Sequence, residues 1–448
     1  MTPGSVAGML ACAIAIVATL RASSEAVIGR AVAACLVIVT VVPATAISDD
    51  VTVVTALASA IFVCVVAFLR KGVRAPSSPL FGVVLFVGLA GWLTLRTLGQ
   101  FSEKSTLLQV GVLASAVAVA LIVPYLTASD LPVLANAFAL SAVAHAAFAV
   151  LEQLRIVDAV WQLRGTGDQG IADRDNVIFS ALVGRSQTSF AHPILLAFFL
   201  CVALIFLLHA TIRLRRARYA LAAICSVIGL VCSGTRSAVV AIIFALCVYA
   251  VASIRWRRLL GIFAFFGVVA IVALQTDLPR VLALDSRFES SVSFIHRSQV
   301  LGSVGDLWAM GWEKRLFGSG VGATAALFDR GIVTGARGLY FFDNTWISMF
   351  ALTGLISVAL LAAVLLWALR GGALAIALAT FIGVMGMSFD EQTWQLPMVL
   401  LALVALLPPA LGTNANTATD VDGERGERRP TPSSPAERGG RPHRLSAS

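Results

Sequence analysis

The chain has 448 residues, of which 58% are hydrophobic and only 13% are charged, and its formal net charge is +9. A sequence so apolar cannot cover the surface of a soluble protein, so lipid is the expected solvent for most of it. The positive charge gathers in short clusters beside apolar runs, which indicates membrane topology and argues against a nucleic-acid partner.

Apolar runs of membrane-spanning length follow one another along most of the chain. A spanning helix needs about 20 predominantly apolar residues, because every backbone N–H and C=O in hydrocarbon must be paired within the segment. The run at 5–20 has no basic residues ahead of it and is interpreted as a helix, not as a signal peptide. In chain order the runs centre on 5–20, 31–47, 51–69, 80–95, 106–126, 131–151, 193–208, 219–232, 238–254, 259–274, 344–369, 373–388 and 395–411. The expected fold is therefore all-α, a polytopic transmembrane helix bundle of about 12–13 spans.

Basic clusters set the expected orientation. Those at 70–74, 213–218 and 255–258 fall on one side if the helices alternate, and cytoplasmic loops carry the excess of Lys and Arg. The predicted domain organisation is then a transmembrane domain over 1–411 with two long extracytoplasmic loops, 152–192 and 275–343. Residues 412–448 are rich in Arg, Pro, Ser and Gly and are predicted to form a disordered cytoplasmic tail.

The second long loop carries two local patterns. Apolar residues recur at helical spacing and predict an amphipathic helix that packs on lipid or on the bundle; they are Val300, Leu301, Val304, Leu307, Trp308 and Gly311. The glycine-rich segment 318–322 follows no strand, which argues against a dinucleotide-binding loop. It is interpreted as a tight turn, either purely structural or one whose N–H groups approach an anionic ligand.

Three arginines on the expected outer side are candidates for holding a phosphate or diphosphate. Arg236 lies in the short turn Ser233-Gly234-Thr235-Arg236-Ser237, Arg185 precedes the helix that begins near Pro193, and Arg297 opens the amphipathic segment. A guanidinium donates bidentate hydrogen bonds and stays charged, so two or three of them can hold a diphosphate without a metal. The alternative for any one of them is an interfacial anchor.

Acidic residues on the same side are candidates for proton transfer. Asp343 stands at the outer start of a helix, where it is either a helix N-cap or a general base for an attacking sugar hydroxyl. Asp390, Glu391 and Trp394 in the last outer loop are possible sugar contacts or interface residues. His145 is expected to be a buried, hydrogen-bonded side chain. The seven cysteines show no metal-type spacing, and no metal or cofactor is expected.

Four passages within 184–370 together resemble the O-antigen ligase and O-antigen polymerase-like family of bacterial envelope synthesis. They are the Arg185 to Pro193 stretch, Ser233-Gly234-Thr235-Arg236-Ser237, the Arg297 to Gly322 segment, and Asp343-Asn344-Thr345-Trp346 followed by Gly354-Leu355-Ile356. Each passage is weak evidence alone, and the first 180 residues match only as a series of spanning helices.

The resemblance implies a metal-independent membrane glycosyltransferase, in the plasma or inner membrane with its active site facing outside. Its partners would be a polyprenyl-diphosphate-linked glycan donor, a glycan or lipid acceptor, and membrane lipid. By this resemblance Arg236 and Arg297 hold the diphosphate, with Arg185 a weaker third. Asp343 joins them in the expected catalytic set as the candidate base named above. The substrate-binding residues expected beside them are Arg185, His192, Ser233, Asn344 and Trp346.

One departure from the family pattern concerns the base. The ligases carry a histidine before the asparagine, whereas this chain has Asp343, as polymerase-like members often do. The alternative functions are a transporter or flippase for a lipid-linked or anionic substrate, and a non-catalytic scaffold. A transporter usually places ionisable groups near the bilayer midplane, whereas the candidates here collect at helix ends.

Overall fold

A computed structural model describes residues 2–44, 49–72, 74–98, 103–161, 176, 182, 184–253, 292–335 and 339–412. Residues Met1–Thr413 form one compact unit. The apolar run expected at 259–274, the basic cluster at 255–258 and nearly all of the expected tail lie outside the described residues.

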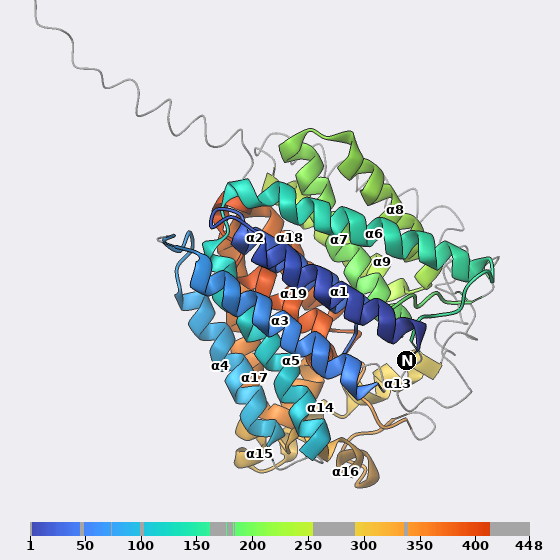
Figure 1. The fold of residues 1–448 in the computed structure, drawn as a ribbon. Helices are drawn as coiled ribbons and strands as arrows, with labels where there is room; N and C mark the ends of the chain where they lie inside the picture. Colours follow the sequence, from blue (N-terminus) through green and yellow to red (C-terminus); the bar gives the residue numbers. More distant parts are fainter. Residues whose placement is uncertain are drawn as a thin grey trace, which may run out of the picture. The chain divides into compact units, whose positions relative to one another are not determined.

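Every regular element in the described ranges is helical, which confirms the all-α prediction (Figure 1). The apolar helices are α1 Pro3–Leu20, α2 Val27–Val41, α3 Asp50–Arg70, α4 Phe81–Thr97, α5 Glu103–Ile122, α6 Leu131–Gln153, α7 Pro193–Leu214, α8 Ala217–Ser233, α9 Arg236–Ser253, α17 Thr345–Ala368, α18 Gly372–Met385 and α19 Gln395–Ala405. Within the described residues, 7 stretches are long and apolar enough to cross a membrane, and the longest of them, Thr345–Met385, contains both α17 and α18.

Four shorter helices lie between the apolar ones: α13 Val292–Gly302, α14 Val304–Ala309, α15 Trp312–Phe317 and α16 Thr324–Asp329. In Figure 1, α15 and α16 lie at one end of the bundle, beyond the ends of α4 and α17. Buried Val300 and Leu307 pack with Phe328 and Phe350 in a second apolar core, whereas Trp308 is 54% exposed. The amphipathic helix expected near 300–311 is therefore present as α13 and α14, and its buried side chains pack on α17.

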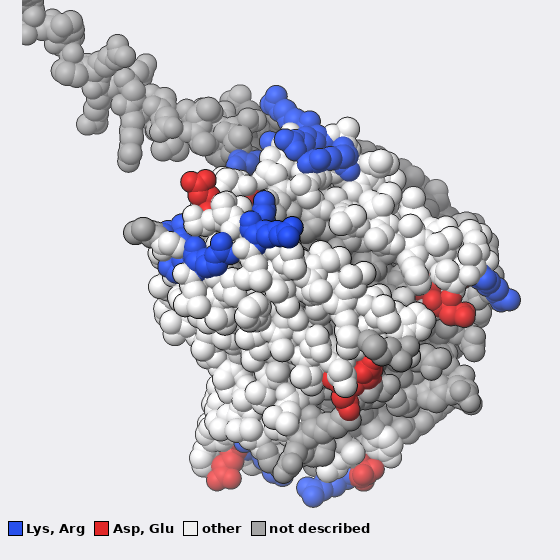
Figure 2. All heavy atoms as spheres, viewed as in Figure 1, with Lys and Arg blue, Asp and Glu red and all other residues white. Residues whose placement is uncertain are grey.

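The described residues of two basic clusters, 70–74 and 213–218, lie at the opposite end of the bundle. Arg70 donates hydrogen bonds to the carbonyls of Leu20 and Ala22, which joins the ends of α1 and α3. Arg74 forms an ion pair with Asp130 at 3.6 Å, at the start of α6. Figure 2 shows most of the visible Lys and Arg side chains gathered at this end, which we call the basic end. The start of α9, with Arg236, and the start of α17, beside Asp343, are helix ends away from these two clusters.

Helix α17 is broken in its interior. Gly354 has φ +81° and ψ 178°, outside the helical region, so the carbonyls before it lose their partners within the helix. The N–H groups of Ser319 and Gly320 donate to the carbonyls of Ala351 and Leu352 at 2.9 and 2.8 Å. The Trp92 indole donates to the carbonyl of Thr353 at 2.8 Å. The glycine-rich segment thus has a structural role, because it donates hydrogen bonds to the carbonyls at the break in α17. The N–H groups of Ser319 and Gly320 are used in these bonds and do not bind an anion.

Candidate active site

The turn between α8 and α9 presents Arg236 as the first residue of α9. The turn is possible because Gly234 adopts φ +64°, a left-handed conformation that commonly ends a helix. Arg185 lies against this turn: its Nε donates to the carbonyl of Ser233 at 3.1 Å and its Nη2 donates to Thr235 Oγ1 at 2.9 Å. Two of the three candidate arginines therefore belong to one local structure.

Ser233 is fully buried, and its hydroxyl donates to the carbonyl of Leu230 at 2.6 Å. In this structure the side chain therefore forms a hydrogen bond within the last turn of α8. Its expected contact with substrate stays a prediction.

His192 connects the arginine turn to the last loop of the site. Its Nδ1 accepts the N–H of Ile194 at 3.1 Å and so caps α7. The carbonyl of the next residue, Pro193, accepts a hydrogen bond from Thr235 Oγ1 at 3.4 Å. The imidazole also lies beside Trp394, with ring centroids 5.7 Å apart. His192 thus joins the turn that carries Arg236 to the loop 386–394 between α18 and α19.

Arg297 and Asp343 meet as an ion pair. Arg297 Nε lies 3.4 Å from Asp343 Oδ2, and the side chains are 31% and 18% exposed. The next-door residue His296 is buried and donates from Nε2 to the carbonyl of Phe341 at 2.9 Å, which fastens α13 to the start of α17. This hydrogen bond from His296 to the Phe341 backbone therefore helps to hold Arg297 close to Asp343.

The helix cap at the start of α17 is Asn344. Its Oδ1 accepts the N–H of Ile347 at 3.0 Å, and its Nδ2 donates to the carbonyl of Met387 at 3.1 Å. The interpretation of Asp343 as the N-cap is therefore wrong: it precedes the cap. Both residue types are good caps, and only the backbone conformation chooses between them.

The loop 386–394 carries two carboxyl groups, Asp390 and Glu391, and Asp390 lies close enough to Asp343 to sense its charge. Asp390 Oδ2 accepts the Ser348 hydroxyl at 2.9 Å, and its Oδ1 is buried with no hydrogen-bond partner among the described residues. Burial raises the pKa of Asp390 to about 7, with a smaller contribution from the charge of Asp343. Burial also raises the pKa of Glu391 well above its ordinary value, with the charge of Asp390 adding to the effect. Glu391 is buried and Asp390 is partly buried, which the position of the loop alone does not reveal.

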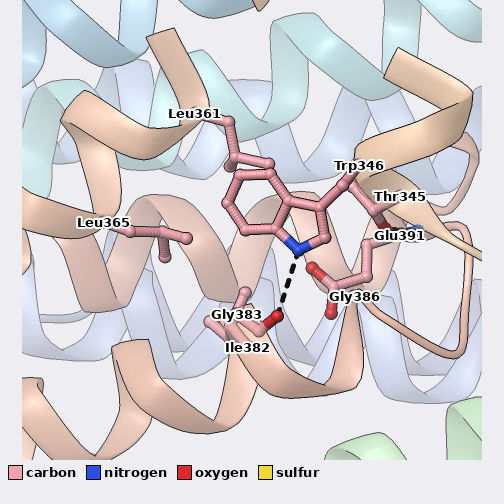
Figure 3. Close-up of a pocket in the computed structure, with 8 residues that line it drawn as sticks. All are labelled: Thr345, Trp346, Leu361, Leu365, Ile382, Gly383, Gly386 and Glu391. Atoms are coloured by element: carbon pink, nitrogen blue, oxygen red, sulfur yellow. Dashed lines mark hydrogen bonds between the residues drawn. The ribbon is translucent and has the colours of Figure 1, made fainter. Parts of the chain in front are cut away.

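A small pocket lies between α17, α18 and this loop (Figure 3). It is lined by Trp346, Leu361 and the Glu391 side chain, among others. Trp346 Nε1 donates to the carbonyl of Gly383 at 3.2 Å across it. The space has no room for a water molecule, so it is a packing gap beneath the candidate site. The indole of Trp346 faces this gap, and its expected role in substrate binding stays a prediction.

Other expectations concern isolated residues. His145 is buried, and its Nδ1 lies 3.2 Å from Thr188 Oγ1, which confirms a hydrogen-bonded core histidine. The seven cysteines are free thiols. Sequence reasoning missed His296, as well as Glu152 and Gln153 at the end of α6. The polar pair that closes an otherwise apolar run was the available signal for Glu152 and Gln153.

Residues 221–362 match a protein family described as O-antigen ligase. The matched segment runs from α8 into α17 and includes Arg236, Arg297 and Asp343, whereas Arg185 and His192 precede it. A search of curated proteins finds no match. Over this segment the chain is similar to the O-antigen ligase family, and the described helices around it have the length and composition of a multi-pass membrane protein.

Proposed function

We propose that the protein transfers or polymerises glycan from a polyprenyl-diphosphate-linked donor on the extracytoplasmic face of the membrane. The observation that carries the proposal is the contact between Arg297 and Asp343 inside the O-antigen ligase-like segment. It supplies a phosphate-binding cation and a proton acceptor side by side. The location of the basic clusters at the other end supports an outward-facing site, because cytoplasmic loops carry the excess of Lys and Arg.

The donor diphosphate is the group that the arginines bind in this proposal. Each charge-assisted hydrogen bond is worth about 1.5–3 kcal/mol, so Arg236 and Arg297 together can hold a diphosphate. Arg236 is the first residue of α9, where the helix dipole adds positive potential. A cation at this position is unfavourable for the helix alone, and a bound anion reverses that cost.

The transfer step balances as a displacement with inversion. The hydroxyl oxygen of the acceptor attacks the anomeric carbon, and the bond from that carbon to the diphosphate oxygen breaks. The electron pair leaves with the diphosphate, which Arg236 and Arg297 stabilise. The hydroxyl proton passes to the Asp343 carboxylate.

The ion pair implies an order of binding within this proposal. While Arg297 contacts Asp343, the guanidinium occupies one oxygen of the carboxylate that is to accept the proton. A donor diphosphate competes for Arg297 and frees Asp343 to accept a proton. The donor therefore binds before the acceptor reacts.

The test uses purified protein in proteoliposomes with an undecaprenyl-diphosphate-linked oligosaccharide and an oligosaccharide acceptor. We expect Arg236→Ala and Arg297→Ala each to abolish product formation while the protein still inserts. Arg330→Ala, an exposed arginine at the same end, is the matched control and should remain active. Near-normal product from both variants contradicts the proposal.

A further inference from the structure

The end of α6 carries two polar residues that the proposed chemistry does not use. Glu152 and Gln153 occupy its last positions, and the last turn of a helix is where a negative charge is unfavourable by about 0.3–1 kcal/mol. Neither residue is exposed, so solvation of a charged surface does not account for them. Their hydrogen bonds show what they hold.

Glu152 fixes the backbone of the segment that follows Arg185. Its two carboxylate oxygens accept the successive N–H groups of Gln187 and Thr188 at 2.8 and 2.9 Å. Thr188 has φ +52°, a left-handed conformation that is unfavourable for a β-branched residue. A residue keeps such a conformation only where its surroundings impose it, and the Glu152 carboxylate is part of that constraint.

Gln153 joins the Arg185 segment to the end of α8. Its Nε2 lies within hydrogen-bond distance of the carbonyl of Gly184 at 3.1 Å, the hydroxyl of Ser186 at 2.9 Å and the carbonyl of Cys232 at 3.3 Å. The N–H of Ser186 donates to the same Cys232 carbonyl at 3.0 Å. The last carbonyls of a helix need partners from outside it, and here those partners come from α6 and from the Arg185 segment.

Arg185 closes this arrangement through its contacts with Ser233 and Thr235. The segment that carries Arg185 is thus held to the turn that carries Arg236 by bonds on both sides of its backbone. We propose that Glu152 and Gln153 are positioning residues that hold these two arginine segments as one unit toward the donor diphosphate. This inference rests on the proposed function, because it needs the arginines to bind that diphosphate.

The binding test measures the affinity of the full chain in lipid nanodiscs for undecaprenyl diphosphate, which carries the diphosphate and lipid but no sugar. We expect Gln153→Met to weaken binding about tenfold, the effect of losing one charge-assisted hydrogen bond from a displaced arginine. Arg185→Ala should weaken binding by a similar factor. The double variant should lose little more than either single variant, because both changes act through the same contact.

A matched control separates positioning from general loss of stability. Tyr219→Phe removes a buried hydrogen bond of 2.9 Å to Asn136, between the same two helices, α6 and α8, but at the basic end. It should lower the thermal unfolding temperature while the affinity stays that of the parent chain. Glu152→Gln is the milder second variant, because one amide oxygen can still accept one of the two N–H groups.

The possible outcomes separate this inference from the proposed function. If Arg185→Ala weakens binding and both Glu152→Gln and Gln153→Met bind as the parent chain does, the positioning role is refuted alone. Full additivity of Gln153→Met with Arg185→Ala also refutes it. If Arg185→Ala and Arg236→Ala both bind normally, the proposed function fails first.

Discussion

Replacing Gly318 with alanine should undo the contact between the glycine-rich segment and the break in α17. Gly318 has φ +74° and ψ −179°, a conformation restricted almost entirely to glycine, and an added side chain costs about 1–3 kcal/mol there. A Cβ atom would also lie 2.3 Å from the carbonyl carbon and oxygen of Leu352, so the backbone must separate.

Separation breaks the two hydrogen bonds that Ser319 and Gly320 donate to α17. Each contributes about 0.5–1.5 kcal/mol. Together, the backbone strain and the two lost hydrogen bonds should lower the unfolding free energy by about 2–6 kcal/mol, mostly at this end of the bundle. Thermal unfolding of the detergent-purified protein, followed by tryptophan fluorescence, measures it.

Two other glycines divide the effect into its parts. Gly331 has φ +68° but nothing within 4 Å of an added Cβ, so Gly331→Ala should show only the conformational cost. Gly311 has neither positive φ nor a close neighbour, so Gly311→Ala should be nearly neutral. If Gly318→Ala is no more destabilising than Gly331→Ala, the reasoning about the α17 contact is refuted.

Three further changes have expected outcomes. The folded state raises the pKa of Asp390 from 3.8 to about 7 and so holds its proton more tightly than the unfolded chain. The stability from this group is present at low pH and is lost as pH rises through about 7. Asp390→Asn should therefore flatten part of the fall in unfolding temperature between about pH 4 and 7, with Glu391 supplying the rest, and an unchanged slope would disprove this assignment. Trp92→Phe leaves the Thr353 carbonyl without its donor and should lower the unfolding free energy by about 1–3 kcal/mol in the same fluorescence assay; no change would mean that another group pairs with it. Arg297→Lys keeps the charge without the planar fork, so it should retain partial transfer activity in proteoliposomes, between the parent and Arg297→Ala; full activity would exclude bidentate binding.

The spanning helices could be predicted because lipid makes the sequence signal strong. Each described helix must satisfy its own backbone, so the apolar runs at 5–20 and 131–151 became α1 Pro3–Leu20 and α6 Leu131–Gln153 with ends shifted by only a few residues. The alternation of basic clusters likewise follows from a local rule that needs no tertiary contacts.

The break in α17 could not be predicted from the sequence. A single glycine in an apolar run is compatible with an intact helix, and the groups that pair with the carbonyls at the Gly354 break come from the glycine-rich segment earlier in the chain. The glycine-rich segment was correctly interpreted as a turn, but its partner depends on tertiary packing. The sequence also could not decide that Asn344, and not Asp343, caps α17, because both residue types are good N-caps.

The candidate site was predictable as a set of residue types and less so as a set of contacts. The pairing of Arg297 with Asp343 agrees with the expectation that a guanidinium meets an acid at this end. The support from Glu152 and Gln153 was not foreseen, since it joins residues that are distant in sequence through backbone groups whose directions no sequence pattern specifies.

A structure of the protein in lipid nanodiscs with bound undecaprenyl diphosphate tests the central claim most directly. The proposed site requires the diphosphate to lie within hydrogen-bond distance of both Arg236 and Arg297, with Asp343 beside it and released from Arg297. A diphosphate bound at the basic end, or in contact with neither arginine, would contradict the account.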